Sequence, residues 1–190
     1  MVDRLSEVQA ELAHLPKRAN GPEAIMLRER RPALLVELSA WPGTAGAVVD
    51  SLEQLCGLRP AVEASRAVRG EKATILTLTP RRWWLITSDA SLVPSLGPDT
   101  GTSVDLSHAR TALRFSGTAT PALLSRGMAV DLHPRAFPVD AVAQSGFAEV
   151  PAVLHRAGEE DYDLFLPRTF ARHVLEWLRE SWPALAAPVD

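Results

Sequence analysis

The chain of 190 residues has one cysteine, few lysines and no long apolar run. The single thiol, Cys56, excludes a disulfide within the chain and any zinc or iron–sulfur site built from several cysteines. No apolar run reaches the length that crosses a membrane, and no signal-peptide pattern follows Met1. These absences predict a reduced, cytoplasmic protein that does not associate with membranes.

An excess of positive charge is also missing. The chain has 20 basic and 23 acidic residues, a net charge of −3, and its only lysines are Lys17 and Lys72. This balance argues against binding to nucleic acid. Because arginine forms planar bidentate contacts, the arginine-rich surface suits partner proteins or carboxylate ligands. The 46% hydrophobic and 23% charged residues predict a globular chain.

Sequence motifs for catalysis and cofactor binding are absent as well. Gly43-Thr44-Ala45-Gly46 lacks the spacing and the third glycine of a dinucleotide-binding turn, and no histidine pair has the i, i+4 spacing of a helical zinc site. Asp105, Ser107 and His108 do not make a triad, since a strand turns the first two to one face and His108 to the other. We therefore predict no catalytic residue, no cofactor-binding residue and no metal ligand in this chain.

Residues 33–108 alternate between strand and helix patterns. Period-2 alternation and β-branched residues predict strands, whereas apolar residues at helical spacing predict helices. The expected elements are a strand at 34–39, a helix at 47–56 ended by Gly57, strands at 73–79 and 83–87, a short helix from 88 to 96, and a strand at 103–107. This order is that of a ferredoxin-like split βαβ (βαββαβ) half.

Residues 109–182 predict a second α+β half, so the fold class is α+β. We expect a strand at 111–115, a helix from 118 to 128, a proline-bounded loop at 131–138, strands at 141–147, 150–156 and 162–166, and a final helix at 168–182. Residues 1–32 form an N-terminal arm in this prediction, and residues 183–190 form a tail.

Two groups of residues are candidates for structural and binding roles. We expect Asp105 and Ser107 to hydrogen-bond backbone where one strand ends and the next begins, and Arg110 to pair with a carboxylate. Trp83 and Trp84 are adjacent in a strand and face opposite ways, so we expect one in the core and the other available to a partner.

The loop with His133, Arg135 and Phe137 is the second part of the expected partner interface, together with apolar residues of the arm. Pro134 and Pro138 stiffen this loop and so lower the entropy cost of binding. Phe137 has an open alternative, which is to fold back into the core.

Several segments resemble one family. Residues 105–117, Asp-Leu-Ser-His-Ala-Arg-Thr-Ala-Leu-Arg-Phe-Ser-Gly, resemble a segment of the aminomethyltransferase superfamily, to which the glycine-cleavage T-protein belongs. Residues 123–137, with Asp131-Leu132-His133-Pro134, are similar to the gamma subunit of bacterial heterotetrameric sarcosine oxidase. Further segments that resemble this family are residues 79–85, 164–170 and 177–178. Met128 departs from the family's usual cysteine, and Arg81-Arg82 replaces an acidic pair.

This resemblance implies a complex that oxidises sarcosine to glycine, with hydrogen peroxide and methylene-tetrahydrofolate as further products. It implies FAD, FMN and NAD in the alpha and beta subunits, tetrahydrofolate in alpha and zinc in delta, with alpha, beta and delta as partners. The chain itself would be a non-catalytic gamma subunit with an aminomethyltransferase-like fold. The alternatives are a free-standing folate-binding or folate-dependent aminomethyltransferase-like protein, and a stand-alone interaction domain unrelated to sarcosine.

Overall fold

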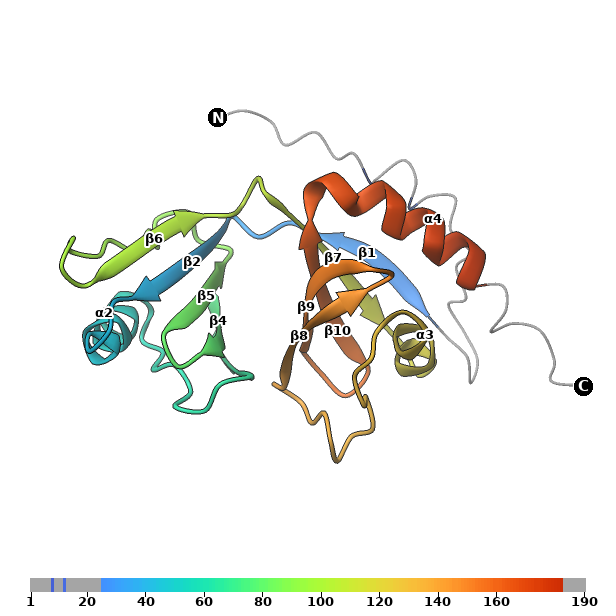
Figure 1. Ribbon diagram of the computed structural model, residues 1–190, viewed down its shortest axis with the longest axis horizontal. Helices are drawn as coiled ribbons and strands as arrows, with labels where there is room; N and C mark the ends of the chain where they lie inside the picture. Colours follow the sequence, from blue (N-terminus) through green and yellow to red (C-terminus); the bar gives the residue numbers. More distant parts are fainter. Residues whose placement is uncertain (1–7, 9–11, 13–24, 183–190) are drawn as a thin grey trace, which may run out of the picture. The chain divides into compact units, whose positions relative to one another are not determined.

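The chain folds into two compact units, each with its own sheet. The structure is a computed structural model that describes Val8, Leu12 and residues 25–182. Among the described residues, unit 1 comprises Val8, Leu12 and residues 25–30, 110–139 and 145–182, and unit 2 comprises 31–109 and 140–144. The described part holds three α-helices and two antiparallel five-stranded sheets, so the α+β fold class is confirmed (Figure 1).

Unit 2 is built on the sheet β3-β4-β5-β2-β6. Its elements are β2 (Leu34–Ala40), α2 (Ala45–Cys56), β3 (Arg66–Arg69), β4 (Ala73–Thr79), β5 (Arg82–Thr87) and β6 (Gly101–Asp105). One face of the sheet packs on α2, which buries Val48 and Leu52 against Leu38, Ile75 and Leu85. Alternate residues of β2, β4 and β5 therefore supply this core, as the sequence pattern predicts.

The helix α2 ends as its sequence indicates. Gly57 takes the left-handed conformation, with φ of 70°, and its N–H donates to the Glu53 carbonyl over 2.8 Å. Glycine adopts this conformation at low cost and is the usual residue after a helix end. The predicted stop at Gly57 is confirmed.

The short helix predicted from 88 to 96 is wrong, because residues 88–100 form turns and irregular backbone without a helix. The Asp89 carboxylate accepts hydrogen bonds from the N–H and the hydroxyl of Ser91, at 2.9 and 2.6 Å. Such a local side-chain bond offers the backbone an alternative to a helix. Pro94, which has no N–H, further opposes helical hydrogen bonding.

Unit 1 carries the sheet β1-β7-β10-β9-β8 together with α3 and α4 (Figure 1). The elements are β1 (Met26–Arg30), β7 (Arg110–Ser116), α3 (Thr120–Gly127), β8 (Val142–Phe147), β9 (Val150–Arg156), β10 (Asp161–Pro167), a 3-10 turn η1 (Arg168–Phe170) and α4 (Ala171–Ser181). The first three residues of β8 are counted with unit 2. Leu113, Leu164 and Leu154 lie side by side across β7, β10 and β9 and are fully buried. They form the apolar row at the centre of this sheet.

The helices of unit 1 are fixed near the turn between β8 and β9. The Phe147 and Trp177 rings meet edge to face at 5.0 Å, and the Ala148 N–H donates to the Gly127 carbonyl over 2.9 Å. A Cβ on Gly127 would come within 2.8 Å of the Phe147 ring and 2.9 Å of the Trp177 ring. Glycine is therefore required where α3 ends against these two aromatic rings.

Two short strands were not predicted from the sequence. Strand β1 lies within residues 1–32, where an arm was expected, and pairs with β7 from Met26↔Ser116 to Arg30↔Ala112. Strand β3 pairs with β4. The rest of the expected arm, Val8 and Leu12 excepted, and the expected tail from 183 onward lie outside the described residues. No helix in residues 25–182 is long and apolar enough to cross a membrane.

Candidate functional site

A charged row crosses the sheet of unit 1. Asp163 of β10 lies opposite Arg114 of β7 on one side and opposite His155 of β9 on the other. Since neighbouring residues of a strand face opposite ways, this row lies on the sheet face opposite the leucine row next to it. Arg30, at the end of β1, also reaches Asp163.

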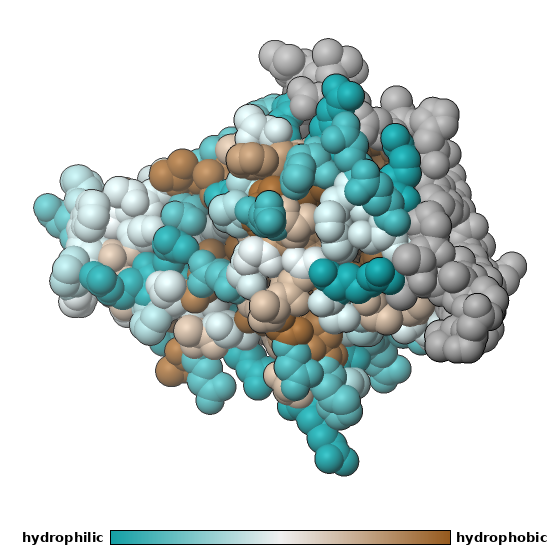
Figure 2. All heavy atoms as spheres, turned by 45° about the vertical axis from the view of Figure 1, so that its right-hand side comes forward, coloured by the Kyte–Doolittle hydropathy of each residue, from teal (hydrophilic) through white to brown (hydrophobic). Residues whose placement is uncertain are grey.

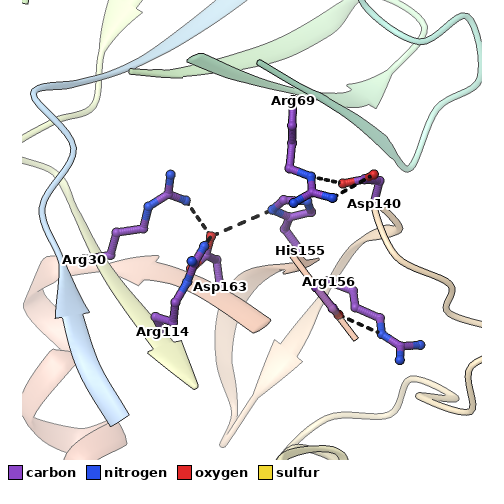
Figure 3. A network of polar contacts seen from close by, with 8 residues as sticks. Arg30, Arg69, Arg114, Asp140, His155, Arg156 and Asp163 are labelled. Carbon is purple, nitrogen blue, oxygen red and sulfur yellow. Dashed lines mark hydrogen bonds and ion pairs between the residues drawn. The ribbon is translucent and has the colours of Figure 1, made fainter. Parts of the chain in front are cut away.

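Asp163 is the centre of this group, the Asp163 network (Figure 3). Its two oxygens accept hydrogen bonds of 2.6 Å from Nε and Nη2 of Arg114, and Nη1 of Arg30 also donates to Oδ2. Nδ1 of His155 lies 3.9 Å from Oδ2. The bidentate fork of Arg114 fixes the carboxylate in the plane that suits both arginines.

Burial makes these contacts strong. The side chains of Asp163 and His155 are 0% and 1% exposed, whereas those of Arg30 and Arg114 are 29% and 19% exposed. A carboxylate removed from water is tolerated when it is paired and hydrogen-bonded. The hydrogen bonds with Asp163 in turn raise the pKa of Arg114. With both carboxylate oxygens engaged by arginines, the network is suited to holding strands together rather than to moving protons.

The motif residues of the β6–β7 connection contact backbone as expected. The Ser107 hydroxyl accepts a hydrogen bond of 2.8 Å from the Leu35 N–H, and the Asp105 carboxylate accepts one of 2.7 Å from the Ser107 N–H. These contacts tie the chain after β6 to the start of β2. Arg110 opens β7 opposite Pro167 of β10, and its pairing with a carboxylate stays a prediction.

The expectation that one of two adjacent tryptophans is exposed is wrong for the isolated chain. Trp83 and Trp84 are each 2% exposed. Trp83 belongs to the core against α2, and Trp84 Nε1 donates to the Glu37 carboxylate over 2.8 Å. The alternation of faces was predicted correctly, but both faces of β5 are buried, so neither tryptophan is available to a partner without rearrangement.

The three candidate interface residues of the loop before β8 differ in their exposure to solvent. His133 and Arg135 are exposed, whereas Phe137 is 5% exposed and follows the core alternative. The Asp131 carboxylate accepts from the His133 N–H at 2.9 Å, and Arg156 Nη1 donates to the Phe137 carbonyl at 2.8 Å. The loop is thus held at both ends and presents its middle to solvent.

The Asp163 network is the feature that the sequence analysis missed. A signal for it was present, because Asp163 interrupts the apolar run 162–166 and Arg114 stands between Leu113 and Phe115. Charges inside strands that are otherwise apolar indicate buried pairs. In the part of the chain that the structure describes, no group of three or more His, Cys, Asp or Glu residues could hold a metal ion.

The architecture places the chain in a structural class. It superposes on the glycine cleavage system aminomethyltransferase T from Bartonella henselae with a TM-score of 0.60 and 16% identity, over 90% of this chain and 48% of that one. The two units therefore have the fold of aminomethyltransferase T-proteins.

The particular family follows from closer relatives. Residues 40–183 match the model of the sarcosine oxidase, gamma subunit family, and the chain belongs to that family. It is 33% identical to the sarcosine oxidase subunit gamma of Arthrobacter sp. over 183 residues, covering 93% of this chain and 89% of that protein. The corresponding subunit of Corynebacterium sp. strain P-1 is 30% identical over 98% of this chain and 96% of that one.

A solved complex contains a similar chain. The heterotetrameric sarcosine oxidase from Corynebacterium sp. U-96, in complex with pyrrole 2-carboxylate, includes a chain that superposes with a TM-score of 0.87 and 26% identity. The superposition covers 98% of both chains.

Proposed function

We propose that this chain is the non-catalytic gamma subunit of a cytoplasmic heterotetrameric sarcosine oxidase, with alpha, beta and delta subunits as its partners. The match to a chain of a solved heterotetramer over 98% of both lengths carries this proposal. The complex converts sarcosine to glycine, hydrogen peroxide and methylene-tetrahydrofolate. FAD, FMN, NAD, tetrahydrofolate and zinc belong to the other subunits in this proposal.

The contacts of two carboxylates, the buried Asp163 and the exposed Asp105, support a structural role for the chain. Asp163 is engaged by Arg114 and Arg30, and Asp105 accepts from the Ser107 N–H. These carboxylates serve the fold rather than a substrate. The strand order β6-β2-β5-β4, with α2 between β2 and the β4–β5 hairpin, supports a ferredoxin-like half in residues 33–108 that has one helix in place of two.

Co-expression with the alpha, beta and delta subunits tests the proposal. We expect the chain to co-purify in equal stoichiometry with them, and the complex to oxidise sarcosine. The chain purified alone should be colourless, contain no stoichiometric zinc, and show neither sarcosine oxidation nor methylene transfer to tetrahydrofolate. Flavin absorbance or turnover in the lone chain contradicts a non-catalytic role.

The likeness to an aminomethyltransferase fold favours one second candidate, a free-standing folate-binding protein. Calorimetric titration of the lone chain with tetrahydrofolate separates the two. Saturable binding of one folate per chain supports this candidate, whereas the subunit proposal expects no heat of binding.

A further inference from the structure

The sulfur atoms of the described residues differ in their access to solvent. Residues 25–182 contain three of them, in Met26, Cys56 and Met128. The side chain of Met26 is 56% exposed, whereas Met128 is 4% exposed and belongs to the core. Because the oxidation of a sulfur atom depends on its access to the oxidant, Met26 is the better target of the two methionines.

Cys56 is protected from oxidation in two ways. Its thiol donates a hydrogen bond of 3.1 Å to the Leu52 carbonyl, one turn earlier in α2. Burial also raises the pKa of Cys56, with a smaller opposing effect from a hydrogen bond with the Leu58 backbone. A thiol with a raised pKa holds little thiolate at neutral pH, and the thiolate is the form that oxidants attack. We therefore expect Cys56 to oxidise slowly.

Exposed apolar side chains are not unusual on this protein. On the face that Figure 2 shows, hydrophobic residues form small groups between hydrophilic ones, as on most folded proteins. Among the described residues, the exposed large hydrophobic side chains are those of Met26, Trp41, Val62, Val93, Val104 and Phe170. Only Met26 in this set carries sulfur, so its chemistry distinguishes it and its exposure alone does not.

The place of Met26 in β1 lets its side chain change without loss of the fold. Met26 begins this strand, which lies outermost among the described strands of its sheet, and it pairs with Ser116 of β7. Main-chain hydrogen bonds make this pairing and do not involve the thioether. Oxidation turns methionine into a polar, chiral sulfoxide, which disrupts a core. At the solvent-exposed Met26, water can hydrate the added oxygen.

We propose that Met26 is an oxidation site, converted to methionine sulfoxide by the hydrogen peroxide that the complex releases. This inference rests on the proposed function, which supplies the peroxide. The thioether sulfur attacks one peroxide oxygen, so an S–O bond forms and the O–O bond breaks. The departing hydroxide takes the proton of the sulfur-bound hydroxyl and leaves as water, so sulfur is oxidised by two electrons and peroxide is reduced. Methionine sulfoxide reductases, with a thiol as reductant, reverse the change.

Added hydrogen peroxide tests the selectivity of oxidation in the lone chain. Mass spectrometry of peptides from the treated protein measures the added oxygen at Met26, Cys56 and Met128. We expect Met26 to oxidise about tenfold faster than the buried Met128, or faster still, because access limits the reaction. The circular dichroism spectrum should stay that of the untreated chain. Equal rates at the two methionines overturn the inference.

The four-subunit complex tests the source of the peroxide. During sarcosine oxidation in air, Met26 sulfoxide should accumulate with turnover, and catalase or the omission of sarcosine should prevent this. Treatment with a methionine sulfoxide reductase and dithiothreitol should return the peptide to its original mass. Met26→Leu removes the sulfur and keeps an apolar side chain of similar volume. This variant should lose the signal and leave the rate of sarcosine oxidation unchanged.

The outcomes are distinct. A complex that does not oxidise sarcosine overturns the proposed function and this inference with it. Sarcosine oxidation without Met26 sulfoxide, when added peroxide does oxidise Met26 in the lone chain, leaves the proposed function intact and overturns the inference. Faster oxidation of Met128 or Cys56 than of Met26 also overturns it.

Discussion

Arg114 holds Asp163 through two parallel hydrogen bonds of 2.6 Å, across the central strand pair β7 and β10 of unit 1. Asp163 is fully buried, so its charge depends on this guanidinium and on Arg30. Removing one partner of a buried ion pair leaves the other uncompensated, which costs more than the pair itself contributes.

Asp163→Asn should therefore strongly destabilise the protein. The amide leaves Arg114 and Arg30 without a carboxylate, and we expect a loss of about 3–5 kcal/mol in the free energy of unfolding. Urea denaturation followed by tryptophan fluorescence measures this loss.

Asp161→Asn is the matched control for that variant. Asp161 lies two residues earlier in β10, is only half-buried and accepts a hydrogen bond from the Ser116 hydroxyl. We expect a loss of about 1 kcal/mol there. Equal effects of the two substitutions would show that Asp163 is not the centre of the charged row.

Ser107→Ala tests the connection between β6 and β7. The substitution removes the acceptor of the buried Leu35 N–H, and leaving such a donor unsatisfied costs about 1–3 kcal/mol. The melting temperature should fall accordingly. His108→Ala is the control at the next, exposed position and should change stability by less than about 0.5 kcal/mol. A Ser107→Ala protein as stable as this control contradicts the predicted role.

The sequence was most informative where one physical preference dominates. Gly57 ended a helix because its left-handed conformation favours glycine, and strands β4 and β10 appeared as apolar runs bounded by polar residues. Strand β1 was not predicted, because Arg28, Glu29 and Arg30 give it the polar sequence expected of an arm. Its pairing with β7, which depends on residues more than 80 positions away, is not visible in the local pattern.

Side-chain partners were harder to predict than elements. Backbone contacts of Asp105 and Ser107 were expected because they are local or lie at a strand end. Burial of both Trp83 and Trp84 was not expected, since alternation tells which face a residue takes but not what covers that face. The Asp163 network required the register of three strands, which a single sequence does not provide.

Arg110→Ala should lower the melting temperature. Arg110 begins β7 and is partly buried, and we predict that it pairs with a carboxylate. Truncating a buried charged partner leaves its mate unsatisfied at a cost of about 1–3 kcal/mol. Thermal unfolding by calorimetry measures the change, with the exposed Arg81→Ala as the control. A melting curve that matches wild type would rule out the pairing.

Tyr162 gives a pH-dependent signal of its own. It is the only tyrosine, it is fully buried, and no hydrogen-bond partner for its hydroxyl lies among the described residues. Burial raises the pKa of Tyr162, with a smaller opposing effect from Arg156, whose guanidinium lies 5.6 Å from the ring centre. Tyrosinate absorbance should therefore titrate at higher pH in the folded chain than in guanidinium chloride.

The sign of the stability change follows. The pKa of Tyr162 is higher in the folded chain than its unfolded value of about 10, so the unfolded chain loses this proton first. The contribution of Tyr162 to the free energy of unfolding is therefore fully present below about pH 10 and is lost as pH rises further. Tyr162→Phe should abolish the absorbance change and remove this contribution. At neutral pH it should leave stability equal or higher, because the hydroxyl it removes has no partner to lose. Coincident folded and unfolded titrations would contradict the predicted shift.

Arg135→Glu tests the loop between α3 and β8 as a partner surface. His133 and Arg135 remain exposed while Phe137 anchors the loop, so a charge reversal at Arg135 alters the surface without disturbing the core. If the loop docks on another subunit, an unfavourable charge at the rim should slow association and weaken co-purification, and more so at low salt. Arg126→Glu, at an exposed position of α3, is the control for net charge. Wild-type assembly of Arg135→Glu at low and high salt would contradict a docking role for this loop.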